Sequence, residues 1–344
     1  MDDLAANAIT AWGFAADQLV PIADGLINRT WRVDLPSGPM GYFQELNTHI
    51  FRAEVHEDIA AVTAALAAAG LPTPRLVPTL SGGLWHTVPP NGVWRLLTPV
   101  GDRTLHRLAH EADAASAARL VARFHAATRN LDWTFRFVRP GAHHTPTHVG
   151  RLQSALETWR GHRLWGPVAQ LAEPLLAAWG RWEGPTDLPD RVIHGDLKIS
   201  NIRFLGSEAH ALVDLDTLAR GTLEVELGDM LRSWCNPASE DTEAPTFHLG
   251  LFEATVRGYA SAGALTRTEW SAVVPGTERI ALELAARFAA DALAESYFGW
   301  NPAFGGRGEH NLLRARGQLA LALSLGGQRR AAEAIVAEVA GACS

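Results

Sequence analysis

The sequence contains a single lysine, Lys198, which stands where an apolar run gives way to a polar loop, in Val192-Ile193-His194-Gly195-Asp196-Leu197-Lys198-Ile199-Ser200-Asn201. Every other Lys/Arg position carries arginine. The arginine side chain ends in a planar fork, whereas lysine is a compact point charge that can approach a phosphate oxygen end-on. The lysine therefore indicates a site that needs a point charge. Chance survival in an arginine-biased composition is the alternative.

Acidic and amide side chains lie close to this lysine in the sequence. Phosphoryl transfer to a hydroxyl needs a carboxylate that takes the hydroxyl proton, oxygen ligands that hold Mg²⁺ on the phosphates, and a cation that offsets the γ-phosphate charge. Asp196 can take the proton, and Lys198 can supply the cation. Asn201 and Asp214 can hold the metal. Asp196 alone is equally typical of a helix cap or turn, so the prediction rests on the group.

Two regions of different character must position these residues. The first hundred or so residues favour a small antiparallel sheet that carries one helix. We predict strands over residues 26–33, 41–46, 84–88 and 93–97, with a helix over 53–69. Gly70 and nearby prolines end that helix, and Pro/Gly-rich turns separate the strands.

After residue 97 the pattern is mainly helical, notably over 111–128, 150–159 and much of 278–325. The exception is two short apolar strands, 191–193 and 211–213, which we predict to form an embedded hairpin whose ends deliver the acidic residues. The fold class is therefore α+β with two lobes. The β-rich N-terminal lobe spans residues 1–97, and the mainly helical C-terminal lobe spans 98–344.

The motif His194-Gly195-Asp196-x-x-x-x-Asn201, followed by Val213-Asp214-Leu215-Asp216, resembles the catalytic and metal segments of the aminoglycoside phosphotransferase/choline kinase-like superfamily. This superfamily includes homoserine kinases and shares its two-lobed fold with protein kinases. The resemblance implies that Asp196 is the catalytic base, that Asn201 and Asp214 are metal ligands, and that His194 supports the loop. It also implies that Asp229, in Leu227-Gly228-Asp229-x-x-Arg232, braces the catalytic loop.

Other segments look like those of the bacterial N-acetylhexosamine 1-kinases and their unassigned relatives. These segments begin at Tyr42, Pro140, Asp214 and Glu309, and they read YFQELNTHIF, PGAHHTP, DLDT and EHNLLRAR. The resemblance covers nearly the whole chain. It is specific for the branch but not for the substrate of any one member.

The nucleotide end of the site is predicted in the N-terminal lobe and at the junction of the lobes. Gly25 would let backbone approach the phosphates, and Asn28 and Thr30 could donate to phosphate oxygens, although an ordinary turn is equally typical of such a segment. Leu97 and Thr98 lie where a hinge would bind adenine through its backbone.

The chain departs from the protein-kinase pattern on the third strand, where those enzymes carry a lysine paired with a helix glutamate. Gln44 stands at the corresponding position and brings no charge. Either Arg29 or Arg95 compensates, or the metal and Lys198 carry more of the load. Glu57 has then lost its usual partner.

Acceptor-binding candidates are Asp216, His144, Trp300, Arg307 and Arg314. Aromatic faces beside polar side chains suit sugars, whose CH faces stack while their hydroxyls form hydrogen bonds. Structural alternatives remain open for several of them, because most tryptophans pack in protein cores and the arginines could form a solvated helix face.

Composition excludes several other classes of protein. A hydrophobic content of 47% and a charged content of 19% are typical of a globular protein. The net charge of -7 argues against a general nucleic-acid binder. Charges interrupt the alanine-rich segments, so no membrane association is predicted. The two cysteines and the acidic start favour a cytoplasmic location. No obligate protein partner is evident from the sequence.

These observations predict a kinase that uses ATP and Mg²⁺ to phosphorylate a small-molecule hydroxyl. The branch resemblance favours the anomeric hydroxyl of a hexose or N-acetylhexosamine. The alternatives are a kinase of an amino alcohol or aminoglycoside, and a pseudokinase that binds nucleotide without transferring phosphate. The missing third-strand lysine is the feature that favours the pseudokinase.

Overall fold

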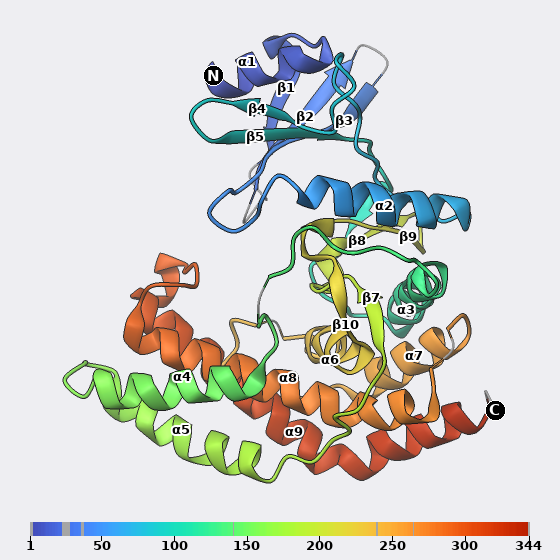
Figure 1. Cartoon of the computed structure of the whole chain (residues 1–344). Coiled ribbons are helices and arrows are strands. Elements are labelled where there is room, and N and C mark those ends of the chain that lie inside the picture. The colour runs from blue at the N-terminus through green and yellow to red at the C-terminus, as the bar shows by residue number, and fades with distance from the viewer. Residues whose placement is uncertain are drawn as a thin grey trace.

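The computed structural model describes residues 3–22, 28–35, 38–139, 141–238, 240–263 and 265–342. In Figure 1 the sheet-rich N-terminal part lies above the larger helical part, and helix α2 (Val55–Ala68) lies between them. This arrangement confirms the predicted α+β fold with a β-rich first lobe and a mainly helical second lobe.

The N-terminal part is built around an antiparallel sheet. Its elements are α1 (Asp3–Ala8), β1 (Leu19–Ile22), β2 (Arg29–Leu35), β3 (Gly38–Glu45), α2 (Val55–Ala68), β4 (His86–Val88) and β5 (Gly92–Leu97), with short 3₁₀ turns η1 (Ile9–Trp12) and η2 (Ala16–Gln18). Within the described residues, the strand order is β1-β2-β3-β5-β4. The predicted strands and helix are confirmed except for their ends. The start of the first predicted strand lies outside the described residues, as does Gly25.

The strands of this sheet alternate between an apolar face and a polar face, as the two-residue period of a strand requires. On the apolar face, Phe43 stacks on Trp94 with ring centroids 5.0 Å apart, and Trp31 lies 5.5 Å from Trp94. Residues of α1 and η1 cover this face and complete a small core. The polar face is thereby directed toward the rest of the molecule.

The C-terminal part contains mostly helices and two small sheets. Its elements are β6 (Arg103–Thr104), α3 (Glu111–Thr128), α4 (Thr145–Thr158), α5 (Trp165–Gly180), β7 (Asp190–Ile193), η3 (Ile199–Asn201), β8 (Ile202–Leu205), β9 (Glu208–Leu212), η4 (Leu215–Thr217), β10 (Ala219–Thr222), α6 (Leu223–Trp234), α7 (Leu249–Ala260), α8 (Arg267–Ala294), η5 (Pro302–Phe304) and α9 (Arg307–Ala342). The three predicted helical regions are confirmed.

The predicted hairpin between residues 191–193 and 211–213 is wrong in its pairing. Strand β7 pairs with β10, while β9 pairs with β8, which also contacts β6. Strands of four or five residues present too little pattern to select a partner. The acidic residues that follow β7 and β9 are nevertheless brought together, because the two small sheets lie side by side.

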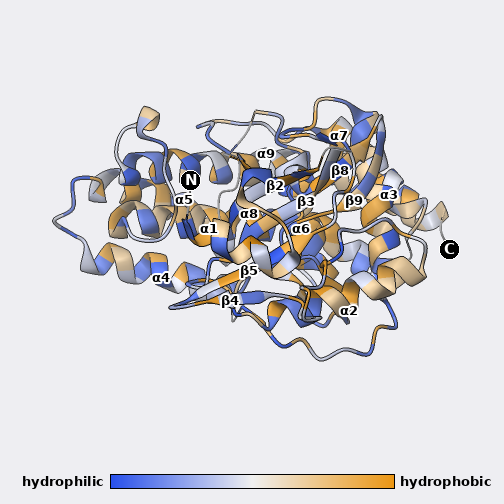
Figure 2. Ribbon diagram, turned by 90° about the horizontal axis from the view of Figure 1, so that it is seen from above, coloured by the Kyte–Doolittle hydropathy of each residue, from blue (hydrophilic) through white to orange (hydrophobic). Residues whose placement is uncertain are grey.

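Helix α8 lies at the centre of the helical part, where it packs against α4, α5, α6 and α9. It begins with a capping box: Glu269 N donates to Thr266 Oγ1 at 3.2 Å, and Thr266 N donates to Glu269 Oε2 at 2.7 Å. Coloured by hydropathy, many of the peripheral loops are hydrophilic, whereas long hydrophobic stretches run through the central elements (Figure 2).

Strand β5, the last strand of the N-terminal sheet in chain order, ends at Leu97. Beyond this point the chain runs into the loop that leads to β6 and α3. We propose that the boundary between the two lobes lies between residues 97 and 98. None of the helices in the described part of the chain is both long and apolar enough to cross a membrane.

Candidate active site

The catalytic loop starts where β7 ends, and Gly195 allows its first turn. Gly195 has a φ of 80°, in the left-handed region, and a Cβ here would lie 2.6 Å from the carbonyl oxygen of Thr217. The preceding residue, His194, is completely buried, and its ring Nε2 donates to Val213 O at 2.9 Å. The loop after β7 is thereby joined to the loop after β9.

Asp196 lies at the centre of a compact polar cluster. Lys198 Nζ donates to Asp196 Oδ2 at 2.7 Å. Asn201 Nδ2 donates to the carbonyl oxygen of Asp196 at 2.9 Å and to Oδ2 at 3.1 Å. The side chain of Lys198 is 35% exposed and that of Asp196 is 26% exposed, so both can meet a substrate. The structure thus brings together the residues that were assigned to the base, the cation and one metal ligand.

Asp214 completes this cluster from the other loop. Its Oδ2 lies 3.9 Å from Lys198 Nζ. Burial opposes the charged form of Lys198, but the carboxylates of Asp196 and Asp214 outweigh it and raise the pKa of the lysine. Burial and the nearby Asp216 carboxylate raise the pKa of Asp214. A divalent cation would relieve this crowding of negative charge.

The donor set fits Mg²⁺ that is shared with a phosphate. Asn201 uses its amide nitrogen on Asp196, so the amide oxygen Oδ1 is the atom of this side chain that could hold a metal. Among the described residues, no group of three or more His, Cys, Asp or Glu side chains could hold a metal by itself. Mg²⁺ commonly takes one or two carboxylates and completes its shell with substrate phosphates and water. Asn201 and Asp214 are the residues that would hold it here.

A cavity of about 460 Å³ opens beside this cluster, within the usual size range of small-molecule sites. Its walls come from the polar face of the N-terminal sheet, from the junction of the lobes and from the two loops. The lining includes Asn28, Thr30, Gln44, Leu97, Thr98, Lys198, Asn201 and Asp214. The cavity therefore contains every described residue that was predicted to contact the nucleotide.

Several of these lining residues already have partners. Gln44 Nε2 donates to Thr30 Oγ1 at 3.1 Å. Asn28 Nδ2 donates to Asp216 Oδ2 at 2.7 Å, and Asn28 Oδ1 accepts from the backbone of Asn47. Side chains that are saturated in this way shape the cavity more than they offer donors to phosphate.

The junction of the lobes shows a similar pattern. Thr98 N donates to Arg75 O at 2.9 Å, and Arg75 N donates to Thr98 Oγ1 at 2.9 Å. The Thr98 N–H, which was predicted as an adenine contact, is therefore engaged by the chain itself. Glu57, which has no lysine partner, is a surface residue on α2 and lies 3.4 Å from Arg136.

Asp216, predicted to contact the acceptor, is instead buried beneath the N-terminal lobe. It is 1% exposed, and both carboxylate oxygens accept hydrogen bonds from Arg95. Burial opposes ionisation of Asp216, but Arg95 outweighs it and lowers the pKa. In this arrangement, Asp216 offers no oxygen to an acceptor.

The brace of the catalytic loop is Glu226, not Asp229. Glu226 Oε1 accepts from the backbone of His194 at 2.7 Å, and Oε2 accepts from the backbone of Gly195 at 3.0 Å. Asp229 lies one helical turn further on and pairs with Arg232 at 2.8 Å. The assignment to Asp229 was therefore displaced by one turn of α6. The sequence signal that could have identified the brace is Glu226 itself, three residues before Asp229 and on the same face of the helix.

The remaining acceptor candidates make local contacts. His144 Nδ1 lies 2.7 Å from Thr147 Oγ1, and Arg307 Nη1 donates to Glu295 O at 2.8 Å. Arg314 donates to Asp241 at 2.8 Å and to a backbone oxygen of the 299 loop. Trp300 is 42% exposed and has a face that a ligand could cover. The structure does not gather these residues around Asp196.

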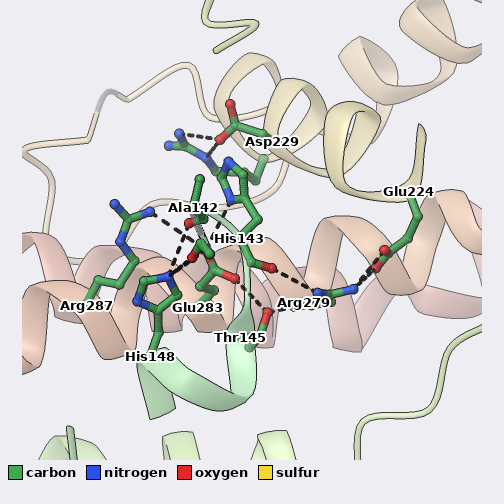
Figure 3. A network of polar contacts seen from close by, with 11 residues as sticks. Ala142, His143, Thr145, His148, Glu224, Asp229, Arg279, Glu283 and Arg287 are labelled. Carbon is green, nitrogen blue, oxygen red and sulfur yellow. Dashed lines mark hydrogen bonds and ion pairs between the residues drawn. The ribbon is translucent and has the colours of Figure 1, made fainter. Parts of the chain in front are cut away.

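A different polar network connects α4 to α8 and extends toward Asp229 (Figure 3). Glu283, which is fully buried, accepts from Thr145 Oγ1 at 2.6 Å and lies 3.1 Å from His143 Nδ1. Burial opposes ionisation of Asp229, yet Arg232 and His143 lower its pKa. Asp229 lies one helical turn after Glu226, which accepts from the backbone of His194 and Gly195, so this network lies close to the catalytic loop.

Arg287 also belongs to this network and was not among the residues predicted from the sequence. Its Nη1 lies 3.7 Å from Glu283, too far for a hydrogen bond, and its guanidinium stacks over Phe298 at 5.5 Å. Burial lowers the pKa of Arg287. Its spacing from Glu283 is i,i+4, which in sequence is typical of a surface ion pair and gave no signal of a site.

Comparison with known proteins gives consistent results. Residues 18–265 match the model of the phosphotransferase enzyme family, APH. A homoserine kinase of Chelativorans sp. (strain BNC1) is 34% identical over 123 residues, which are 33% of this chain and 36% of that protein. The chain therefore matches only about a third of the length of that curated relative.

Solved structures resemble nearly the whole chain. The microcompartment-associated aminopropanol kinase has a TM-score of 0.65 at 18% identity, covering 96% of this chain and 98% of that one. The amicoumacin kinase hAmiN, in complex with AMP-PNP and Ca²⁺, has a TM-score of 0.60 at 13% identity, covering 89% and 90%. At these identities the likeness establishes the fold.

Proposed function

The chain belongs to the phosphotransferase enzyme family, and from that premise we propose that it is a kinase that uses ATP and Mg²⁺ to phosphorylate a small-molecule hydroxyl. The observation that carries the proposal is the cluster of Asp196, Lys198 and Asn201 with Asp214, beside a cavity of about 460 Å³. A pseudokinase would have no need to keep a base, a cation and two metal ligands in contact.

In the proposed reaction, Asp196 takes the proton of the acceptor hydroxyl. Among the described residues, the hydrogen bonds to its carboxylate end on Oδ2, which leaves Oδ1 to receive the proton. The acceptor oxygen bonds to the γ-phosphorus, the bond from that phosphorus to the bridging oxygen breaks, and ADP leaves. Lys198 offsets the charge on the transferred group. Mg²⁺, when bound, neutralises charge on the phosphates.

For the acceptor, we favour the anomeric hydroxyl of a hexose or N-acetylhexosamine. The surfaces next to the catalytic cluster carry charges of both signs, with Arg287 and Arg139 near Asp229 and Glu283. Such a surface can donate to and accept from several neutral hydroxyls. Tyr297 is 58% exposed and, with Arg139 5.9 Å from its ring centroid, combines an aromatic surface with a charged donor. A polycationic aminoglycoside would require a more uniformly acidic site.

The second candidate acceptor is an amino alcohol or a hydroxyl-bearing amino acid. It is supported by the similarity of the chain to a homoserine kinase in sequence and to an aminopropanol kinase in fold. Arg287 could bind a carboxylate, and Asp229 could bind an ammonium group. The same two side chains therefore serve either acceptor class, and the choice is an experimental one.

A screen of sugars and amino alcohols for acceptor-dependent ADP release tests the proposal. We expect release with a sugar, and a phosphorus NMR signal in the anomeric phosphate range rather than in that of a 6-phosphate. Release with amino alcohols alone would select the second candidate. Mg²⁺-dependent ATP binding without release for any acceptor would overturn the kinase proposal and favour a pseudokinase.

A further inference from the structure

A buried ion pair joins the N-terminal sheet to the loop that carries Asp214. Arg95, on β5, donates to both oxygens of Asp216, and the side chains are 2% and 1% exposed. The two residues lie 121 positions apart in the chain. The paired, two-bond geometry fixes both the separation and the orientation of the groups, which a single point contact would not do.

The partners of this pair come from one row across the sheet. Thr30, Gln44 and Arg95 lie opposite one another on β2, β3 and β5. Arg95 Nε donates to Gln44 Oε1 at 2.9 Å, and Gln44 Nε2 donates to Thr30. Gln44, at the position where protein kinases have their lysine, thus orients Arg95. The pair is therefore embedded in the sheet.

The carboxylate end of the pair is held equally firmly. Asn28 Nδ2 donates to Asp216 Oδ2 at 2.7 Å, and Asn28 is itself fixed by Asn47 N at 2.9 Å. His56, fully buried on α2 and stacked on Trp85 at 5.3 Å, lies beside the pair. Burial and Arg95 lower the pKa of His56 to about 4, so it adds no charge at neutral pH.

The pair acts on the chain two residues after Asp214. Asp216 lies in the turn η4, and Asp214 directly precedes that turn with a φ of 63°. A non-glycine residue in the left-handed region is strained and needs support from its surroundings. Asn201 O accepts from Val213 N at 2.9 Å on one side of Asp214, and Arg95 holds Asp216 on the other.

We propose that Arg95 and Asp216 are positioning residues that set the place where Asp214 presents its carboxylate to the metal, and that they substitute structurally for the missing lysine–glutamate pair. This inference rests on the proposed kinase function. It differs from the expectation that Arg95 contacts phosphate, because the guanidinium is directed at Asp216 and Gln44. Arg29, the other candidate, is a largely exposed residue that lies 2.8 Å from Glu45.

The test measures binding of mant-ATP, a fluorescent ATP analogue, with Mg²⁺ and with EDTA. Arg95→Gln and Asp216→Asn should each weaken binding about tenfold in Mg²⁺ and leave binding in EDTA unchanged. The double variant should be no weaker than the weaker single variant, because both substitutions break one interaction. The matched control is the exposed Arg32–Asp34 pair on β2, whose two bonds are both 2.6 Å. Arg32→Gln and Asp34→Asn should change neither measurement.

A buried charge without its partner can prevent folding, so Arg95→Met with Asp216→Leu removes both charges together. This variant should fold, as judged by circular dichroism, and still lose the Mg²⁺-dependent gain in affinity. The inference is overturned if that Mg²⁺-dependent gain persists in the folded Arg95→Met/Asp216→Leu variant. It is also overturned if Arg95→Gln weakens binding equally in EDTA while Asp216→Asn does not, which would indicate a direct phosphate contact. Failure of the wild-type protein to bind mant-ATP would instead count against the proposed function.

Discussion

Two ion pairs beside the cavity connect a basic residue to an aspartate, and they differ in almost every other respect. The Lys198–Asp196 pair is 35% and 26% exposed and has one carboxylate oxygen available to a substrate. The Arg95–Asp216 pair is 2% and 1% exposed, and its carboxylate is fully engaged. Exposure thus separates a pair that can take part in chemistry from one that can only hold its surroundings in place.

The residue types follow the same division. The partly exposed pair uses lysine, a mobile point charge that can turn from a carboxylate to a phosphate. The buried pair uses arginine, whose planar fork fixes orientation. In the proposed mechanism, the single lysine of this chain therefore lies at the contact where a cation must change partners, and arginine lies where the cation must not.

The largest effect is expected for Asp196→Asn, which removes the proposed base from the exposed pair. Turnover should fall by about a thousandfold, since general bases contribute about 10²–10⁴. Mg²⁺-dependent nucleotide binding should be largely kept. ADP-release kinetics with mant-ATP binding measure both, and Asp190→Asn, at the exposed first residue of β7, is the control. Near-normal turnover in Asp196→Asn would remove the base from the mechanism.

Lys198→Arg is a sharper test of the comparison, because it keeps the charge and changes the geometry. We expect kcat to fall by about 10- to 100-fold, with a smaller change in the KM for ATP. Steady-state kinetics at saturating Mg²⁺ measure the two constants. If the variant works as well as wild type, the lysine is a chance feature of the composition. The two pairs would then differ in exposure but not in the need for a particular cation.

Glu226→Gln extends the comparison to a second buried carboxylate. Burial opposes ionisation of Glu226, but His125 outweighs it and lowers the pKa below the usual value. A lowered folded-state pKa gives stability that is present above the unfolded-state pKa and is lost as pH falls through the folded value. At neutral pH the variant should lose about 2 kcal/mol, and its stability should depend less on acid.

Urea unfolding at neutral and acidic pH measures this difference, with Glu253→Gln, an exposed residue of α7, as the control. If the stability of Glu226→Gln and that of wild type fall equally with acid, then the ionised Glu226 carboxylate does not stabilise the fold. An unchanged stability with reduced kcat would show that the brace acts on the site alone.

The smallest effect is expected for Arg287→Met, which alters the acceptor side and neither ion pair. The KM of the acceptor should rise about tenfold while the KM for ATP stays constant, because a charged hydrogen bond contributes about 1.5–3 kcal/mol. Two-substrate kinetics separate the constants. A rise in the KM for ATP would place Arg287 at the nucleotide and not at the acceptor.

The catalytic cluster was predictable because it is mainly local. Asp196, Lys198 and Asn201 lie within six consecutive positions, and the turn at Gly195 fixes their mutual geometry. The longer elements were also predictable, since apolar periodicity over 12 or more residues specifies a helix.

The remaining features depend on tertiary contacts that leave little local pattern. The pairing of β7 with β10 joins strands of four residues each, and the Arg95–Asp216 pair joins the two lobes. Glu226 and Asp229 share one helix face, so only the position of the loop determines which one braces it. Arg307 and Arg314 were predicted from a segment that has polar side chains near aromatic residues, and in the structure they bind Glu295 O and Asp241.

The one lysine also makes the protein suitable for labelling at a single side-chain amine. An amine-directed acylating reagent meets a single side-chain target in the whole chain, and that target lines the cavity. The fraction of molecules acylated at Lys198, measured by mass spectrometry, then reports the fraction whose cavity is empty. Acylation of the α-amino group serves as the internal standard. A nucleotide or inhibitor that fills the cavity would be detected as protection, without knowledge of the acceptor and without any turnover.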